Sequence, residues 1–120
     1  MQRKRCRATT KGKHATLRIP EARLAAMVEE AMVDCYGESE QACGLFTLLE
    51  ENLAVPFATE VLGTPVTVER VDFKARDEIV AVCTRARHRQ SVPILDLPLP
   101  TPAPAGAEWI AAYAYWRSGA

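Results

Sequence analysis

Two stretches of the chain carry apolar residues at the spacing of an α-helix. From Leu24 to Cys35 apolar side chains recur at i, i+3, i+4, i+7 and i+11, and the same spacing returns from Ala42 to Leu53. Gly37, between the two stretches, is a residue that commonly ends helices in the left-handed conformation. The pattern therefore predicts two N-terminal helices, joined either as a bent hairpin or as one long helix with a kink.

After Pro56 apolar and polar positions alternate, which is the period of a half-buried strand. Residues 57–61 form the first such stretch, and a second begins at Val66. The apolar positions of the second stretch change parity midway, so we expect a β-bulge near Glu69–Arg70 that returns them to one face. The sequence therefore predicts two short strands, the second of them bent.

The following segment predicts a second pair of strands. Ile79–Cys83 is a continuous apolar run rich in β-branched residues, as expected of a central strand. A charged hairpin tip is expected over 85–90, followed by a returning strand over 92–95 that Pro93 assigns to a sheet edge or a bulge. Four alternate prolines between 98 and 104 then predict a stiff, extended connector.

A last helix is predicted near the end of the sequence. Trp109, Ala112, Tyr113 and Trp116 repeat the helical spacing and would bring large aromatic side chains to the core. The expected fold class is α+β, with an N-terminal helical pair, a small curled antiparallel (SH3-like) four-stranded sheet and a C-terminal helix. We expect these elements to form a single domain over residues 19–120.

The formal net charge of zero conceals an asymmetry. Seven of the fifteen Lys and Arg residues fall within residues 1–18, which hold no acid, so the rest of the chain carries eight cations against fifteen acids. We interpret residues 1–18 as a flexible basic arm on a mildly acidic domain. No apolar run approaches the roughly 20 residues of a membrane span, and the arm lacks the apolar stretch of a signal peptide, so we expect a cytoplasmic protein with no membrane contact.

The sequence contains no motif of a known enzyme class. A P-loop, a nucleophile elbow, a zinc-protease helix and a dinucleotide fingerprint are all missing, and we predict that the protein is not an enzyme. The four cysteines form no C-x-x-C pair of the kind that binds zinc. Cys35, Cys43 and Cys83 fall at apolar positions of the predicted elements, where we expect them to be buried as small hydrophobic residues.

The basic residues allow one alternative function, nucleic-acid binding. The arm could neutralise phosphates, and a second basic patch could form at Arg85, Arg87, His88 and Arg89. The aromatic residues that usually stack on single-stranded nucleic acids are committed to the predicted core, which argues against this function. Its candidate contacts are Arg3, Lys4, Arg5, Arg7, Lys11 and Lys13.

The acidic residues favour a metal site. Glu50 and Glu51 occupy the last predicted turn of the second helix, where the helix dipole makes each exposed acid cost about 0.3–1 kcal/mol. Carboxylates, an amide oxygen and free carbonyls are the ligands that Ca²⁺ prefers, although solvation or pairing with Arg70 or Lys74 would also explain these acids. No EF-hand loop is present, so separated segments would have to supply the site. The candidate ligands are Glu40, Glu50, Glu51, Asn52, Asp77, Glu78, Asp96 and Glu108.

The run Y-G-E-S-E-Q-A at residues 36–42 and the run L-E-E-N-L-A-V-P-F at 49–57 resemble the small cyanobacterial-type calcium-binding proteins of the CcbP family. The valine-rich strand at 66–71, the V-P-I run at 92–94 and the tryptophans of the last helix extend the resemblance over about residues 28–118. The resemblance implies calcium binding without an EF-hand on a small α+β domain. Glu40, Glu50 and Glu51 match acidic positions of the family.

The chain also departs from the better-known members of that family. It carries the basic arm and a short Lys74–Glu78 turn in which Arg76 would repel a cation. A member that keeps the scaffold without the metal is therefore the second hypothesis. Such a protein would act as an interaction module, with the arm binding nucleic acid or an acidic protein that the sequence does not identify.

Overall fold

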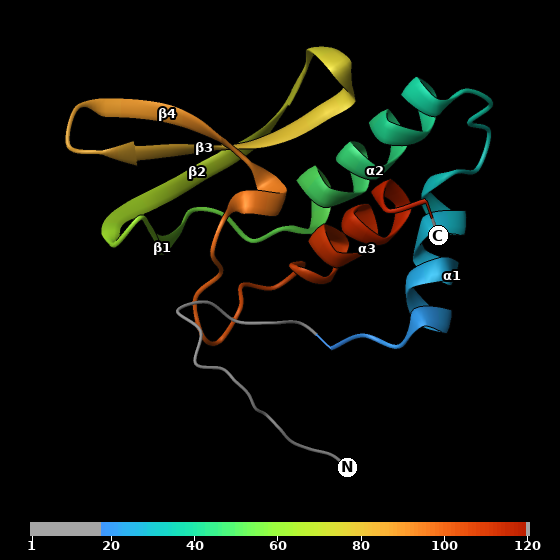
Figure 1. Ribbon diagram of the computed structural model, residues 1–120, viewed down its shortest axis with the longest axis horizontal. Coiled ribbons are helices and arrows are strands. Elements are labelled where there is room, and N and C mark those ends of the chain that lie inside the picture. Colours follow the sequence, from blue (N-terminus) through green and yellow to red (C-terminus); the bar gives the residue numbers. More distant parts are fainter. Residues whose placement is uncertain (1–17, 120) are drawn as a thin grey trace.

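The computed structural model describes residues 18–119, and this part of the chain contains three α-helices and one four-stranded sheet (Figure 1). In Figure 1 the sheet lies on one side and the helices lie together on the other. The elements are, in order, α1 (Glu21–Ala31), α2 (Glu38–Asn52), β1 (Phe57–Val61), β2 (Thr64–Lys74), a 3-10 turn η2 (Ala75–Asp77), β3 (Glu78–Arg85), β4 (His88–Pro93), a second 3-10 turn η3 (Ile94–Asp96) and α3 (Glu108–Arg117). The predicted α+β class is confirmed.

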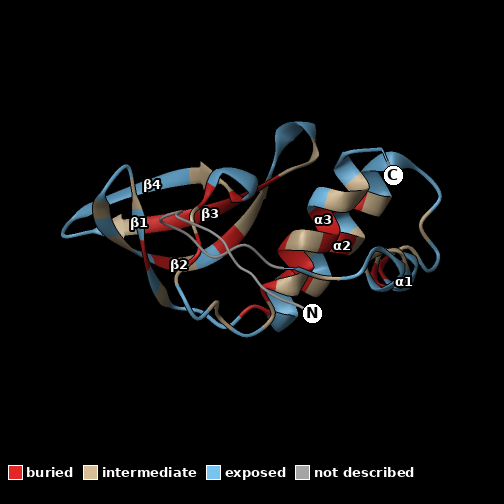
Figure 2. Ribbon diagram, turned by 60° about the horizontal axis from the view of Figure 1, so that its bottom comes forward, coloured by how far each residue is buried: buried red, intermediate tan, exposed pale blue. Residues whose placement is uncertain are grey.

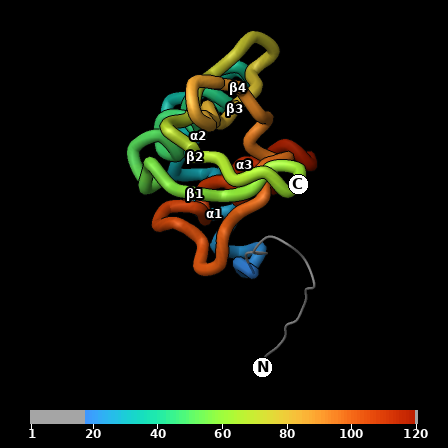
Figure 3. The backbone as a smooth tube through the Cα atoms, turned by 90° about the vertical axis from the view of Figure 1, so that its left-hand side faces the viewer, coloured from blue at the N-terminus to red at the C-terminus, as the bar shows by residue number. Residues whose placement is uncertain are grey.

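The sheet is antiparallel throughout, with the strands in sequence order β1-β2-β3-β4. The register of β2 against β3 shifts between Val68 and Arg70, which confirms the predicted bulge. Viewed from the end, the β3–β4 hairpin lies above the β1–β2 hairpin (Figure 3). Because β1 and β4 each pair with one strand, both are edges of the described sheet.

The core lies between the inner face of the sheet and the helices α2 and α3. Figure 2 shows buried residues concentrated on β3 and on the facing sides of these two helices. Leu45, Leu49, Ile79 and Tyr113 are almost completely buried there, and burying each such side chain contributes about 1.5–3 kcal/mol. This packing fixes α3 against the end of the sheet where β2 turns into β3.

The first two helices are separate neighbours joined by a turn, and the end of α1 at Ala31 lies against Gly44 in the middle of α2. α1 ends at Ala31, several residues before the predicted end, because the Met32 amide already donates to both Val28 and Glu29. The left-handed residue after it is Asp34, at φ 65°, whereas Gly37 is extended and precedes α2. The prediction that Gly37 ends the first helix was therefore wrong. Aspartate tolerates this conformation because its short polar side chain can hydrogen-bond locally.

The predicted burial of the cysteines is confirmed for Cys83 only. Cys35 lies in the turn after α1 and is half-buried, and Cys43 is exposed on α2. Cys43 is exposed because the buried face of α2 runs through Ala42, Leu45 and Leu49, and Cys43 lies beside that face.

The β3–β4 hairpin is tighter than predicted. Its turn is only Ala86–Arg87, and His88 already pairs with Arg85 as the first residue of β4. The observed strand runs from His88 to Pro93, and residues 94–96 form η3. The prediction of a strand over 92–95 therefore placed it too far towards the C-terminus. Pro93 does lie on an edge strand, as predicted.

The proline-rich connector has no regular secondary structure and leads to α3, which confirms the predicted C-terminal helix. The connector packs on the end of α2, where the Ala54 amide donates to the Ala105 carbonyl at 2.8 Å. The six predicted nucleic-acid contacts and Cys6 lie outside the described residues. Within residues 18–119, no helix has the length and apolar character required to cross a membrane.

Candidate metal site

The C-terminal end of α3 reaches the η2 turn through Tyr113 and Arg117. The Tyr113 hydroxyl donates to the Asp77 carbonyl and accepts from the Ile79 amide, each at 3.4 Å. Arg117 Nη1 donates to the Tyr113 hydroxyl at 3.0 Å and to the Asp77 carbonyl at 3.4 Å. The guanidinium also lies over the Tyr113 ring, 5.6 Å from its centroid. These contacts place a positive charge against the backbone of η2.

The side chain of Asp77 connects the same turn to α2. Its Oδ2 atom accepts a hydrogen bond of 2.9 Å from the Ser39 hydroxyl in the first turn of that helix. Asp77 and the preceding Arg76 both adopt the left-handed conformation, at φ 60° and 66°. Left-handed non-glycine residues cost on the order of 1–3 kcal/mol each and persist where surrounding contacts hold them. Asp77 is thus held where α2, η2 and α3 meet.

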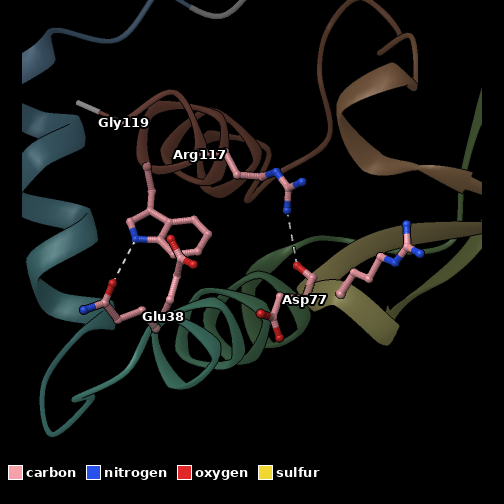
Figure 4. A pocket seen from close by; sticks show the side chains of 7 residues that line it. Glu38, Asp77, Arg117 and Gly119 are labelled. Carbon is pink, nitrogen blue, oxygen red and sulfur yellow. Dashed lines mark hydrogen bonds between the residues drawn. The ribbon is translucent and has the colours of Figure 1, made fainter.

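A cavity of about 620 Å³ opens at this junction (Figure 4). Figure 4 shows Glu38 and Asp77 along its floor and Arg117 reaching from α3 towards Asp77. Trp116 Nε1 closes another side by donating to Gln41 Oε1 at 3.1 Å. The cavity is also lined by Arg76, so two carboxylates are balanced by two guanidinium groups.

A second, smaller cavity of about 150 Å³ shares Arg117 with the first. Two more acids, Glu78 and Asp96, line it. Arg117 therefore borders both cavities, and four carboxylates from three segments of the chain line one or the other of them: Glu38, Asp77, Glu78 and Asp96.

Three of the eight predicted ligands, Asp77, Glu78 and Asp96, thus lie near Arg117. Glu40 is exposed nearby on α2, where its carboxylate accepts from the Tyr36 amide at 2.7 Å. Another predicted ligand, Glu108, lies on α3, where its Oε2 atom is 4.0 Å from Nη2 of Arg23.

The remaining three predicted ligands lie at the other end of α2. Glu50 and Glu51 are exposed, and neither forms a salt bridge within the described residues. The amide nitrogen of Asn52 donates to the Leu48 carbonyl at 2.7 Å, so its side chain folds back on its own helix. The structure therefore does not bring the eight residues together. Across residues 18–119, no three His, Cys, Asp or Glu side chains form a group arranged to hold a metal.

Sequence reasoning missed two residues of the junction, Glu38 and Arg117. Glu38 had a visible signal, since it belongs to the acidic run that begins α2 and marks the family resemblance. Arg117 carried no such signal, because its contact with Asp77 joins residues 40 positions apart.

The donor atoms at the junction suit calcium in kind but only partly in charge. Carboxylate, amide, hydroxyl and carbonyl oxygens are all calcium ligands, and six to eight are needed around one ion. Around the larger cavity, Asp77 and Glu38 supply carboxylate oxygens, Gln41 supplies an amide oxygen, and the backbone of Asp77 supplies a carbonyl oxygen. The positive charges of Arg76 and Arg117 repel a bound cation, so the residues fit a weak calcium site better than a tight one.

The comparisons with known proteins agree with this fold. No curated protein sequence matches the chain. A solved structure described as the crystal structure of Anabaena CcbP superposes with a TM-score of 0.67 at 18% identity, covering 85% of this chain and 94% of that chain. At that identity the match concerns the fold. The family model Calci_bind_CcbP, described as calcium binding, matches residues 25–117 and confirms the resemblance found in the sequence. Because the match spans most of the chain, this protein belongs to that family.

Proposed function

We propose that this chain is a non-enzymatic calcium-binding protein, a buffer or a sensor, and that Asp77 is the central ligand of its site. Membership of a family described as calcium binding supports the function. The observation that supports the location is that Arg117 lines both cavities, which are also lined by carboxylates from three segments of the chain. The fold already holds one cation at the Asp77 carbonyl, and this supports placing a bound cation at the same junction.

In this proposal Arg117 acts as an internal cation that calcium replaces. Releasing the exposed Arg117 side chain breaks its 3.4 Å hydrogen bond to the Asp77 carbonyl and its 3.0 Å hydrogen bond to the Tyr113 hydroxyl, both of which water can replace. Its release would leave the Asp77 carbonyl with the Tyr113 donor, and the second lone pair of the carbonyl oxygen could then bind the ion beside the carboxylate. Bound calcium would supply two positive charges that neutralise the acids and hold α2 against the turn of the sheet.

The charges around the junction predict a weak, selective site. With two arginines near the acids, we expect a dissociation constant on the order of 10⁻⁴–10⁻³ M, the weak end of the range for protein calcium sites. Mg²⁺ should bind less well because it loses its water reluctantly and requires near-ideal octahedral geometry. Glu38, Glu78 and Asp96 are the acids best placed to complete the site.

A thermal-shift titration of the full chain with calcium chloride tests the proposal. At 10 to 100 times the dissociation constant, calcium should add about 1.4–2.7 kcal/mol to the free energy of unfolding. The variant Asp77→Asn should lose this shift, since asparagine keeps the shape and the hydrogen bond with Ser39 but removes the charge. Asp72→Asn is the matched control, because Asp72 is an acid in the same strand–turn region that lines neither cavity.

Two further variants separate the proposal from its rivals. Arg117→Gln should tighten calcium binding roughly five- to tenfold, because it removes a like charge a few ångströms from the ion. Glu50→Gln/Glu51→Gln should leave the shift unchanged. Loss of the shift in that double variant, with Asp77→Asn unaffected, would move the site to the end of α2. A flat response of the wild type to 10 mM calcium would favour the interaction module, whose basic arm would then be tested by removing residues 1–18.

A further inference from the structure

The inner face of the sheet is not fully covered by the helices. Between the β1–β2 hairpin and the β3–β4 hairpin it forms a cavity of about 310 Å³, which we call the seam pocket. Its apolar lining comes from one residue on each strand: Val61, Val66, Cys83 and Val92. A volume of this size can hold one apolar side chain with room for its neighbours, at the lower limit of typical ligand pockets.

The strand register explains why these side chains meet. Val68 lies opposite Cys83, and Cys83 lies opposite Gln90, so all three share the inner face. Side chains alternate along each strand, which also brings Arg85, His88 and Val92 to this face. The pocket therefore has an apolar floor and a rim made by the cation Arg85 and by His88.

The charge and exposure of the rim point to an acidic partner. Among the residues that the structure describes, no acid lines the seam pocket. Arg87 adds another cation in the turn next to the rim, whereas Arg89, on the outer face, is already paired with Glu69 at 3.5 Å. Leu62, in the turn between β1 and β2, also lines the pocket and is 98% exposed. Within residues 18–119 neither Arg85 nor Arg87 forms a salt bridge, so an apolar hollow beside these two cations matches an apolar side chain flanked by carboxylates.

The strand beside the pocket has a free backbone edge. Residues Arg85 and His88 flank a two-residue turn, and such flanking pairs are hydrogen-bonded to each other. The alternation that follows directs the amides of Arg89 and Ser91 away from β3. Pro93, which has no amide, takes the next outward position, as prolines of edge strands do. An incoming strand would therefore find two amide donors along β4.

We propose that β4 and the seam pocket bind an extended acidic segment of a partner protein. The segment would pair with the free edge of β4 and insert one apolar side chain into the seam pocket, while its acids approach Arg85 and His88. Strand addition supplies affinity through the backbone, and a pocket for alternate side chains supplies specificity. This inference is independent of the calcium site, which involves none of the residues lining the seam pocket.

The probe is a phage-displayed library of random twelve-residue peptides selected on the immobilised full chain. We expect the enriched peptides to combine acids with an apolar residue, and the strongest of them, made synthetically, to shift the amide NMR signals of β4. Arg85→Glu/His88→Glu should weaken its binding at least tenfold, whereas Arg70→Glu, an exposed cation outside the pocket, should not. Ser91→Pro should weaken it too, because that change removes an outward amide.

Four results would overturn the proposal. They are enrichment of basic or featureless peptides, binding that survives Arg85→Glu/His88→Glu, signals that shift elsewhere on the domain, and no enrichment at all. Two controls identify other occupants. Octanoate that binds the seam pocket where the selected peptides do not would make it a site for small apolar anions. Sedimentation showing a dimer that Arg85→Glu/His88→Glu dissociates would make the occupant a second copy of the chain.

Discussion

Gly106 is the position where a single methyl group should damage the fold most clearly. It adopts φ +85°, and a Cβ atom there would lie 2.0 Å from the Asn52 carbonyl oxygen and 2.7 Å from the Leu53 nitrogen. These are backbone atoms at the end of α2, so no side chain can turn aside to make room. Gly106→Ala must therefore separate the connector before α3 from α2.

The cost follows from three contributions. A left-handed residue with a Cβ costs about 1–2 kcal/mol, and overpacking against atoms that cannot yield typically costs about 1–3 kcal/mol. Separating the two segments also lengthens the hydrogen bond from Ala54 to Ala105, worth about 1 kcal/mol. We expect a total loss of roughly 3–6 kcal/mol, which for a domain of this size lowers Tm by at least about 12 °C.

Urea and thermal unfolding of Gly106→Ala should be compared with Gly63→Ala. Gly63 also has a positive φ, +77°, but a Cβ atom there meets nothing within 4 Å. Both changes restrict the unfolded chain equally, so this contribution cancels in the comparison. Gly63→Ala should cost only about 1–2 kcal/mol. If Gly106→Ala proved no more destabilising than Gly63→Ala, the close approach of the connector to α2 would be refuted.

Three further predictions concern the helix contact, an acid and the thiols. Gly44→Ala should destabilise the domain by about 2–4 kcal/mol in urea unfolding, because its Cβ would lie 2.3 Å from the Ala31 carbonyl of α1, while Gly37→Ala, with nothing within 4 Å, should cost far less. The hydrogen bond from the Phe73 amide, followed by the charges of Lys74 and Arg70, holds the pKa of Asp72 below its ordinary value of 3.8. The ionised group therefore stabilises the fold above that pH, so Asp72→Asn should be destabilising at pH 7, and the difference from wild type should shrink as unfolding is measured at pH values falling below 3.8. Burial raises the pKa of the Cys83 thiol, so a thiol reagent at pH 8 should modify the exposed Cys43 rapidly and Cys83 only on unfolding; equal rates in the native protein would contradict the described burial.

The elements that the sequence predicted well are those whose side chains face a core in a regular pattern. The parity change in β2 revealed the bulge between Val68 and Arg70, because a strand buried on one face must return its apolar side chains to that face. β4 lacked any such signal. His88, Arg89 and Gln90 are all polar and exposed, and it is backbone pairing with β3 that makes them a strand.

The candidate site was only partly predictable for a related reason. Acids could be found by type and position, and Asp77, Glu78 and Asp96 were among the predicted ligands. Their grouping depends on contacts between distant segments, such as Ser39 with Asp77 and Arg117 with Asp77. No periodicity encodes these contacts, since they follow from how α2 and α3 pack against the turn of the sheet.

The two ends of α2 show why position matters more than the number of acids. At the C-terminal end, Glu50 and Glu51 are adjacent in sequence and exposed, and neighbouring residues on a helix do not face each other. No partner fixes either carboxylate, so an ion there would have to order both side chains itself. At the N-terminal end, Ser39 already holds the carboxylate of Asp77, and the Tyr113 hydroxyl holds its carbonyl. Arg117 counts against calcium when charges are simply added, but its guanidinium is exposed and bonded to the Asp77 carbonyl and the Tyr113 hydroxyl, and within residues 18–119 it pairs with no carboxylate. A ligand set held before binding loses less side-chain freedom when the ion arrives, and this advantage is what favours Asp77 over Glu50 and Glu51.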